Sequence, residues 1–319
     1  MKDLTTNQHL SARDEDLAVI AVPAVMAQRL AARCTAAMTG HQWSMGNLRT
    51  ARAVLRSPDS ASLVGRLAAR LSRRRSAPGW AVLALPPSLD DGAMRIAAAG
   101  LLGAVGRPFF SISQQGRLWI GQESSPARDV AAFGGIGEQR LHIDAPNVER
   151  VPDYTSLLIL RPDPAGGGAS LIGDLHAAMS VLSDDDRAQL ARPVFFEGRA
   201  DGLSGVGAPR MPFPILDATG GGPPWIRWAG KMLDDPRNDS DLMPVVRRFA
   251  DALTRCTHEL MLHRGHLLIA DQQRVAHGRT ALGDQTGLPD GSRRLLQQAK
   301  AAAEPTAPVH DSMLAGHGE

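Results

Sequence analysis

A histidine and an aspartate two positions apart, in His142-Ile143-Asp144, are the first candidates for chemistry in this sequence. Residues two apart on a β-strand point to the same face, so this pair could bind one metal ion. The pattern alone says little, because ten histidines and an acidic frequency of 33/319 predict about one such pair by chance. A second pair, His317 and Glu319, occupies the last three residues, where chain ends are seldom ordered. The surrounding sequence must therefore distinguish the two pairs.

Short apolar runs that alternate with turn signals surround the first pair. They lie at 118–120, 156–160, 170–172, 194–196, 267–270 and 294–298, and stretches rich in glycine or proline at 162–168 and 220–224 fall between them. This rhythm predicts an antiparallel β-barrel or sandwich after about residue 108. A long helical pattern at 239–263 interrupts it.

The part of the chain before residue 108 is predicted to be mostly helical. Helices are expected at 23–39, 59–75 and 88–105, and a buried strand at 80–85, which two prolines end. We find no internal repeat and expect one domain over residues 1–319. Its predicted parts are a polar N-terminus (1–16), a mostly helical part (17–107), a β-core (108–300) with a helical insertion (239–263), and a disordered tail (301–319).

The composition excludes several classes of protein. Lys+Arg 35 against Asp+Glu 33 leaves a net charge of +2, so no overall field favours nucleic acid or an anionic membrane. Lysine occurs only as Lys2, Lys231 and Lys300, and the other bases are arginine. Two cysteines are too few for a disulfide framework or a cysteine-rich metal site. The N-terminus lacks the pattern of a signal peptide and no apolar run reaches membrane-spanning length, so a soluble, cytoplasmic protein is expected.

Other motifs are weaker candidates. His258 and His263 lie five apart, roughly 140° around a helix, whereas a zinc-protease helix needs histidines four apart. Arg70 and the run 73–75 have no aromatic residues between them and are typical of a solvated helix end. The glycines at 166–168 are not followed by the lysine and hydroxyl residue of a phosphate-binding loop.

Four ordered segments between about residues 108 and 300 carry a resemblance to a known family. They are the His142-Ile143-Asp144 motif, a glycine-rich turn followed by Ala169-Ser170-Leu171-Ile172, the stretch from Gly265 to Thr280 that contains Asp271, Gln272, His277 and Arg279, and Asp290-Gly291-Ser292-Arg293-Arg294. Together they resemble the clavaminate synthase-like branch of the Fe(II)/2-oxoglutarate oxygenases, cousins of taurine dioxygenase. The resemblance implies a mixed α and β fold, a double-stranded β-helix (jelly roll) with flanking helices.

The resemblance also implies the site residues. His142 and Asp144 match the proximal iron ligands and His277 the distal one. Two imidazoles and one carboxylate suit non-haem Fe(II) and leave three positions open, which 2-oxoglutarate and O2 fill in the family. Arg294 matches the arginine whose planar guanidinium binds the far carboxylate of 2-oxoglutarate, and Ser170 matches a threonine that contacts this co-substrate.

The sequence departs from the family pattern at several positions. His266 stands where an aspartate is usual, and Gln272 replaces an asparagine. The loop at 283–289 is a few residues longer than the family pattern. Either Arg293 or Arg294 could therefore match the arginine that binds the co-substrate. Successive side chains on a strand point to opposite faces, so only one of the two can enter the barrel. The D-G-x-x-R spacing of the family indicates Arg294 as the co-substrate-binding arginine. Strand alternation indicates the same residue if Leu296 packs inward, because Arg294 and Leu296 then share a face.

The activity implied is hydroxylation of an unactivated C–H in a free or modified amino acid of secondary metabolism, such as antibiotic biosynthesis, with formation of succinate and CO2. Halogenation is disfavoured because the carboxylate ligand, Asp144, is retained. Glu138 and Arg227 stand where the family often lines its substrate pocket, although exposed surface charges explain them equally well. The partner is then a small molecule, with no nucleic acid or membrane, and the sequence does not indicate the oligomeric state.

Three alternatives remain open at this stage. The same iron site could catalyse desaturation or ring formation. The chain could be a β-barrel that binds a ligand without redox chemistry. It could also be a metal-dependent hydrolase or isomerase.

Overall fold

The computed structural model describes residues 19–38, 43–73, 76–109, 117–128, 133–197, 212–219, 224–238 and 241–310. Its helices are α2 (Ala24–Ala36), α3 (Met45–Leu55), η1 (Pro58–Ser60), α4 (Ala61–Leu71), α5 (Asp91–Leu102), α6 (Leu175–Ser180), α7 (Asp184–Leu190), η2 (Gly230–Asp234) and α8 (Met243–Arg255). Its strands are β1 (Val19–Ala21), β2 (Trp80–Ala84), β3 (Gly106–Pro108), β4 (Ile120–Glu123), β5 (Gln139–His142), β6 (Tyr154–Arg161), β7 (Ser170–Asp174), β8 (Leu216–Asp217), β9 (Trp225–Ile226), β10 (Thr257–Leu260), β11 (His266–Asp271), β12 (Val275–Arg279) and β13 (Leu295–Ala303).

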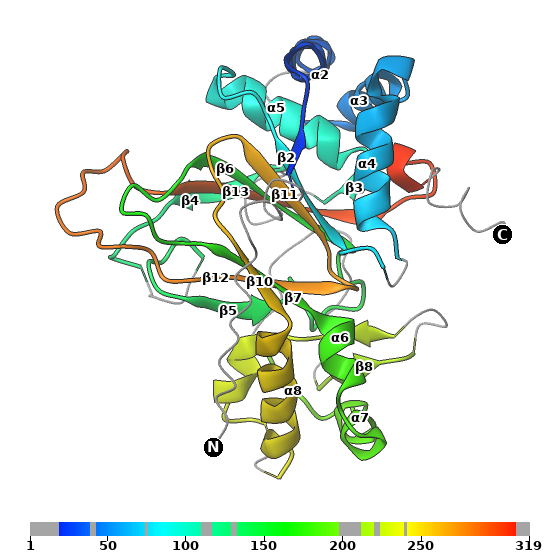
Figure 1. The fold of residues 1–319 in the computed structure, drawn as a ribbon, viewed down its shortest axis with the longest axis vertical. Helices are drawn as coiled ribbons and strands as arrows, with labels where there is room; N and C mark the ends of the chain where they lie inside the picture. The colour runs from blue at the N-terminus through cyan, green and yellow to red at the C-terminus, as the bar shows by residue number, and fades with distance from the viewer. Residues whose placement is uncertain are drawn as a thin grey trace, which may run out of the picture.

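Two larger sheets form the centre of the molecule (Figure 1). A seven-stranded sheet has the order β1-β2-β11-β6-β13-β3, and β4 pairs with β13 beside it. A four-stranded sheet has the order β10-β7-β12-β5. All strand pairs in both sheets are antiparallel except β1 with β2.

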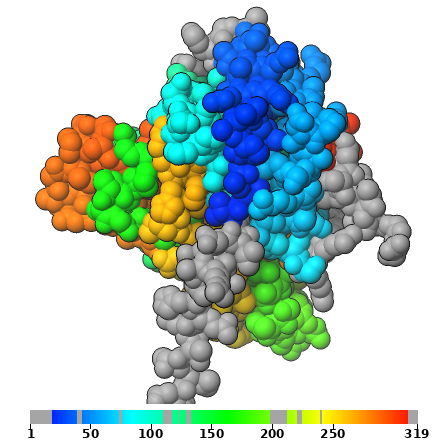
Figure 2. All heavy atoms as spheres, turned by 45° about the horizontal axis from the view of Figure 1, so that its top comes forward, coloured from blue at the N-terminus to red at the C-terminus, as the bar shows by residue number. Residues whose placement is uncertain are grey.

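The seven-stranded sheet is covered on both faces, and this explains its continuous apolar runs. In β11, Leu267 and Ile269 pack with the helices α2 to α5, whereas Leu268 and Ala270 pack toward the smaller sheet. In Figure 2 these N-terminal helices, coloured blue to cyan, occupy the middle of the visible face. The second cluster joins the two sheets, since Ile172 of β7 and Val275 of β12 belong to it. The space between the sheets is therefore lined by alternate residues of each strand.

A third cluster lies under the smaller sheet, where α6 and α8 pack together with the chain around β9 and η2. The helix α8 contributes Val245, Val246, Phe249 and Leu253 from one face. The chain that follows β5 also enters this cluster through Ile143 and Val148. The cluster therefore supports the backbone around Asp144 from below.

The predicted elements agree with the structure in type more than in length. The three N-terminal helices and the strand at 80–85 are present as α2, α4, α5 and β2. The predicted helix at 239–263 is wrong beyond residue 255, because the chain turns there and residues 257–260 pair with β7. The predicted strand at 194–196 is reduced to one bridge between Phe195 and Phe213. The helix α3 was not expected from the sequence.

The expected disordered tail is also corrected as far as residue 310. The strand β13 continues to Ala303, and the side chains of Ala307 and Val309 are buried. The Val309 N–H donates to the Ala104 carbonyl at 2.8 Å. Small side chains had indicated disorder, but they also allow a strand and a turn to pack closely against the N-terminal part. Residues 1–16 and the His317–Glu319 pair lie outside the described residues. No helix among the described residues is long and apolar enough to cross a membrane.

Candidate metal centre

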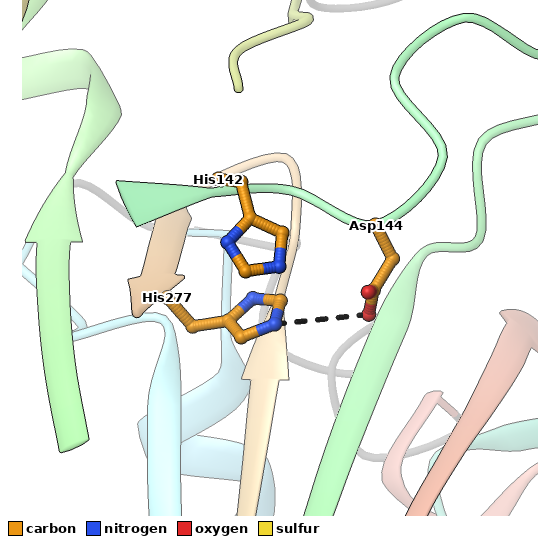
Figure 3. Close-up of side chains that lie close together, drawn as sticks. All are labelled: His142, Asp144 and His277. Atoms are coloured by element: carbon orange, nitrogen blue, oxygen red, sulfur yellow. Dashed lines mark ion pairs between the residues drawn. The ribbon is translucent and has the colours of Figure 1, made fainter. Parts of the chain in front are cut away.

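Strand register brings the two candidate histidines together. The strands β5 and β12 are antiparallel neighbours, and His142 is the Cα partner of His277. Side chains of directly opposed residues stand on the same face of a sheet. The two imidazole rings accordingly lie with centroids 4.4 Å apart and planes inclined by 45° (Figure 3). Residues 135 positions apart in the chain thus form one side of a possible metal site.

Asp144 completes the cluster from the chain just beyond β5. The potential ligand atoms of His142, Asp144 and His277 all lie within 4.8 Å of one another. Asp144 Oδ2 is 3.9 Å from His277 Nε2, the contact drawn as a dashed line in Figure 3. Asp144 and His277 are buried and His142 is half-buried. Among the described residues, this is the one group of three His, Cys, Asp or Glu side chains close enough to bind a metal ion.

The backbone around Asp144 is held in an unusual conformation. Ala145 has φ 52°, the one positive φ of a non-glycine residue in the described parts of the chain. Such a conformation costs free energy and persists where neighbouring contacts impose it. The Ile143 N–H donates to the Trp228 carbonyl at 2.8 Å, and the Gln272 side chain accepts a hydrogen bond from the Asp144 N–H. Gln272 also donates to the Pro152 carbonyl, so this substitute for the family asparagine positions the carboxylate ligand.

Arg227 holds the same turn from the other side, and its burial corrects the alternative expectation that it is an exposed surface charge. Its guanidinium is buried and donates to Asp217 at 2.7 Å. It also donates to the carbonyls of Pro146 (2.8 Å) and Val148 (2.7 Å). The charge of Arg227 is thus used inside the protein, directly after the turn at Ala145. Asp217 lies on the same hairpin, as the partner of Trp225, but the sequence could not reveal the contacts with Pro146 and Val148, which are 81 and 79 positions away.

Three polar groups of the seven-stranded sheet surround the Asp144 carboxylate. Gln298 Nε2 lies 3.2 Å from Oδ1 and 3.1 Å from Oδ2, and Lys300 Nζ lies 3.6 Å from Oδ1. Burial alone would raise the pKa of Asp144, but the charge of Lys300, the two histidines and a hydrogen bond with Thr155 hold it well below its usual range. Asp144 is therefore a carboxylate at neutral pH, as a metal ligand must be.

Both histidines are suited to donate a lone pair. Burial, with the charges of His142 and Lys300, lowers the pKa of His277 to about 3, so this imidazole is neutral at physiological pH. His142 Nδ1 lies 2.8 Å from the Arg140 carbonyl. Donation of a proton from Nδ1 to that oxygen leaves Nε2 as the free acceptor, which is the usual arrangement behind a metal-bound histidine. The donor set of two neutral imidazoles and one carboxylate fits a divalent transition metal.

Arg294 is buried, whereas Arg293 is half-buried and paired with the loop before β13. Arg293 pairs with Asp290 at 2.7 Å and donates to the Leu288 carbonyl. Arg294 is 7% exposed, and its guanidinium has no hydrogen-bond or ion-pair partner among the described residues. Burial and the neighbouring charge of Arg279 lower the pKa of Arg294 to about 10. The charge of Asp163 opposes this shift but forms no ion pair with Arg294, and a buried cation without a direct partner indicates a place for an anion.

The predicted strand alternation explains this arrangement. Leu296 belongs to the cluster between the sheets, as expected, whereas Leu295 packs with the helices. Gln298 and Lys300 continue the inward row of Arg294 and Leu296. They were missed as site residues, although the same alternation would have placed them inside.

The remaining predicted residues lie near this row or near β5. Ser170 is buried at the start of β7 and is the Cα partner of Arg279. Arg279 donates to the carbonyls of Gly135 and Gly137, which lead into β5. Glu138 is exposed directly before β5.

Comparison with solved structures identifies the class of fold. Asparagine oxygenase in complex with Fe(II), 2S,3S-3-hydroxyasparagine and succinate superposes with a TM-score of 0.69 at 22% identity, covering 89% of this chain and 93% of that one. The non-heme iron oxygenase OrfP in complex with Fe and alpha-ketoglutaric acid gives a TM-score of 0.65 at 18% identity, covering 90% and 94%. The chain therefore has the fold of these oxygenases.

Sequence comparison identifies the relatives. Residues 78–207 match the model of the taurine catabolism dioxygenase TauD, TfdA family. L-asparagine oxygenase of Streptomyces coelicolor (strain ATCC BAA-471 / A3(2) / M145) is 30% identical over 196 residues, 56% of this chain and 52% of the relative. The match thus spans about half the length of that relative. The resemblance to the taurine dioxygenase-like family of oxygenases, first drawn from four motifs, is confirmed.

Proposed function

We propose that the chain is an Fe(II)/2-oxoglutarate-dependent oxygenase that hydroxylates an unactivated C–H of a free or modified amino acid. The observation that carries the proposal is the cluster of His142, Asp144 and His277, two of them buried, with the buried cation of Arg294 on the adjoining sheet. A metal site and an anion site in one interior are what this chemistry requires.

Iron would be held by Nε2 of His142, Nε2 of His277 and Oδ2 of Asp144. The carboxylate is ionised and His277 is neutral at physiological pH, so no proton has to leave these two ligands before a divalent ion binds. When bound, the iron supplies activation of O2 together with 2-oxoglutarate, which is converted to succinate and CO2. Three protein ligands leave the positions that these two co-substrates need.

The co-substrate 2-oxoglutarate would place its far carboxylate against Arg294. A planar guanidinium binds a carboxylate through two charge-assisted hydrogen bonds, and Arg294 has both donors available within the described structure. Ser170, buried on the facing sheet, would add a hydroxyl contact. Arg279 is less suited, because its donors already bind the carbonyls of Gly135, Gly137 and Thr280.

The two facing sheets are consistent with a double-stranded β-helix, and we assign the whole chain, residues 1–319, to one oxygenase domain on that basis. Support for an amino-acid substrate comes from the relatives, one an L-asparagine oxygenase and another crystallised with (3S)-hydroxy-L-Arg. Glu138 remains a candidate for contacting the amino group of such a substrate, since it is exposed beside β5. A role in antibiotic biosynthesis and a cytoplasmic location stay predictions from the sequence.

The test is succinate formation from 2-oxoglutarate with a panel of free amino acids, each assayed with and without Fe(II) and with and without O2. Turnover that needs both, and that is stimulated by one class of amino acid, is expected. Conversion of the added compound without O2 and without succinate formation would indicate a hydrolase or isomerase, and tight binding of the compound without any conversion would indicate a binding protein. Mass spectrometry of the product separates hydroxylation, which adds one oxygen atom, from desaturation or ring formation, which removes two hydrogens.

A further inference from the structure

We propose that Lys300 is the internal counter-ion of the metal-ligating carboxylate, so that it orders Asp144 before iron binds and lowers the affinity of the site for iron. The inference rests on the metal site proposed above and deepens it. It concerns a residue that none of the family motifs includes.

The first support is the position of Lys300. Its side chain is 2% exposed and its Nζ lies 3.6 Å from Asp144 Oδ1. It reaches this place from β13, on the sheet opposite the histidines. A buried ammonium is costly unless a charge or several acceptors compensate it, and the ionised Asp144 carboxylate is such a charge.

The second support is the division of the carboxylate between two neighbours. Asp144 Oδ1 faces Lys300, and Oδ2 faces His277 Nε2 at 3.9 Å. Gln298 Nε2 lies within hydrogen-bond distance of both oxygens. A metal ion bound by the two histidines would therefore meet Oδ2, while Lys300 faces Oδ1 and Gln298 lies beside both oxygens.

The third support is the choice of residue. The chain uses arginine for nearly all of its basic positions, and only three are lysine. An ammonium is a compact point charge on a flexible stem, whereas a guanidinium is a broad planar fork with five donors. A compact cation can lie beside one oxygen of a carboxylate without covering the other.

Electrostatics give the direction of the effect. Without metal, the carboxylate of Asp144 and the ammonium of Lys300 form a buried pair at 3.6 Å and compensate each other. A divalent ion that binds Asp144 must then share the carboxylate with a fixed positive charge. Replacing Lys300 by a neutral residue leaves the metal as the main counter-ion of Asp144, so metal should bind more tightly and the metal-free protein should be less stable.

The experiment measures the affinity of Co(II), an oxygen-stable probe for the iron site, by calorimetry on the full-length protein without 2-oxoglutarate. Lys300→Met and Lys300→Gln should both bind Co(II) roughly tenfold or more tightly than the wild type, because about 1.4 kcal/mol of removed repulsion corresponds to one decade. Lys300→Arg keeps the charge and should not bind Co(II) more tightly than the wild type. The melting temperature of the metal-free protein should fall in the two neutral variants, and saturating Co(II) should restore more of it than in the wild type.

Gln297→Met is the matched control, because Gln297 is buried in the same strand and points to the other face. A loss of packing alone lowers the melting temperature with and without metal and leaves the Co(II) affinity unchanged. If both neutral Lys300 variants behave in that way, or bind Co(II) more weakly than the wild type, the inference is overturned. If the wild type itself binds no Co(II), or if His277→Ala binds as well as the wild type, the proposed metal site fails instead. If Lys300→Met does not fold, Lys300→Gln decides.

Discussion

The replacement of Arg294 by glutamine should have opposite effects on 2-oxoglutarate binding and on the stability of the protein alone. Arg294 is buried without an acceptor for its guanidinium among the described residues. Its pKa is lowered to about 10, chiefly by burial. Relative to the usual value of about 12.5, this shift corresponds to a cost on the order of 3 kcal/mol for keeping the charged group inside. The cost is offset when an anion binds.

The magnitude follows from the contacts that an anion would make. Each charge-assisted hydrogen bond to a carboxylate contributes about 1.5–3 kcal/mol, so loss of one or two raises the dissociation constant for 2-oxoglutarate roughly tenfold or more. Arg294→Gln should at the same time leave the melting temperature of the ligand-free protein unchanged or higher, because an uncompensated buried charge is removed.

Arg293→Gln is the control for this prediction. Arg293 pairs with Asp290 at the edge of the loop, so its loss should change 2-oxoglutarate binding little. The assays are calorimetric titration of the Co(II)-loaded protein with 2-oxoglutarate and thermal unfolding without it. Unchanged binding in Arg294→Gln, or weaker binding only in Arg293→Gln, would refute the assignment of the inward face of β13.

Further outcomes can be checked in the same way. Alanine at any of the three candidate metal ligands should abolish succinate formation and Co(II) binding while circular dichroism stays that of the wild type, whereas His317→Ala should change neither. Arg227→Met should destabilise the protein by roughly 3–5 kcal/mol in chemical unfolding, because Asp217 would be left buried with one partner fewer, and should also weaken Co(II) binding because the turn after Asp144 loosens. Burial raises the pKa of Asp271 to about 6, although the charge of Arg73 opposes this shift. The protonated carboxyl therefore stabilises the fold at low pH, and this contribution is lost as the pH rises through about 6. Asp271→Asn should therefore gain stability over the wild type at pH 8 and not at pH 4 in urea titrations, and an equal gain at both values would contradict this cause.

Local patterns in the sequence determined the types of the elements and one pair of candidate ligands. Helical periodicity predicted α2, α4 and α5, because their buried faces are set by spacing within a few turns. Asp144 follows His142 by two residues, so the chain itself keeps the two close. Strand alternation distinguished the inward-facing Arg294 from Arg293, because successive residues of a strand point to opposite faces.

Tertiary structure decided what depends on partners far away in the chain. His277 meets His142 through the register of β12 on β5, and no local pattern specifies that register. The sequence left Arg227 as either a substrate contact or an exposed surface charge, and the structure buries it, where it holds the turn after Asp144 through Asp217 and two carbonyls. Lys300 becomes part of the site only because β13 lies across from β5, where its buried ammonium lies 3.6 Å from Asp144 Oδ1. The free energy of burying each of these polar groups depends on its partners in the folded protein. Those partners come from distant parts of the chain, so no local sequence pattern predicts them.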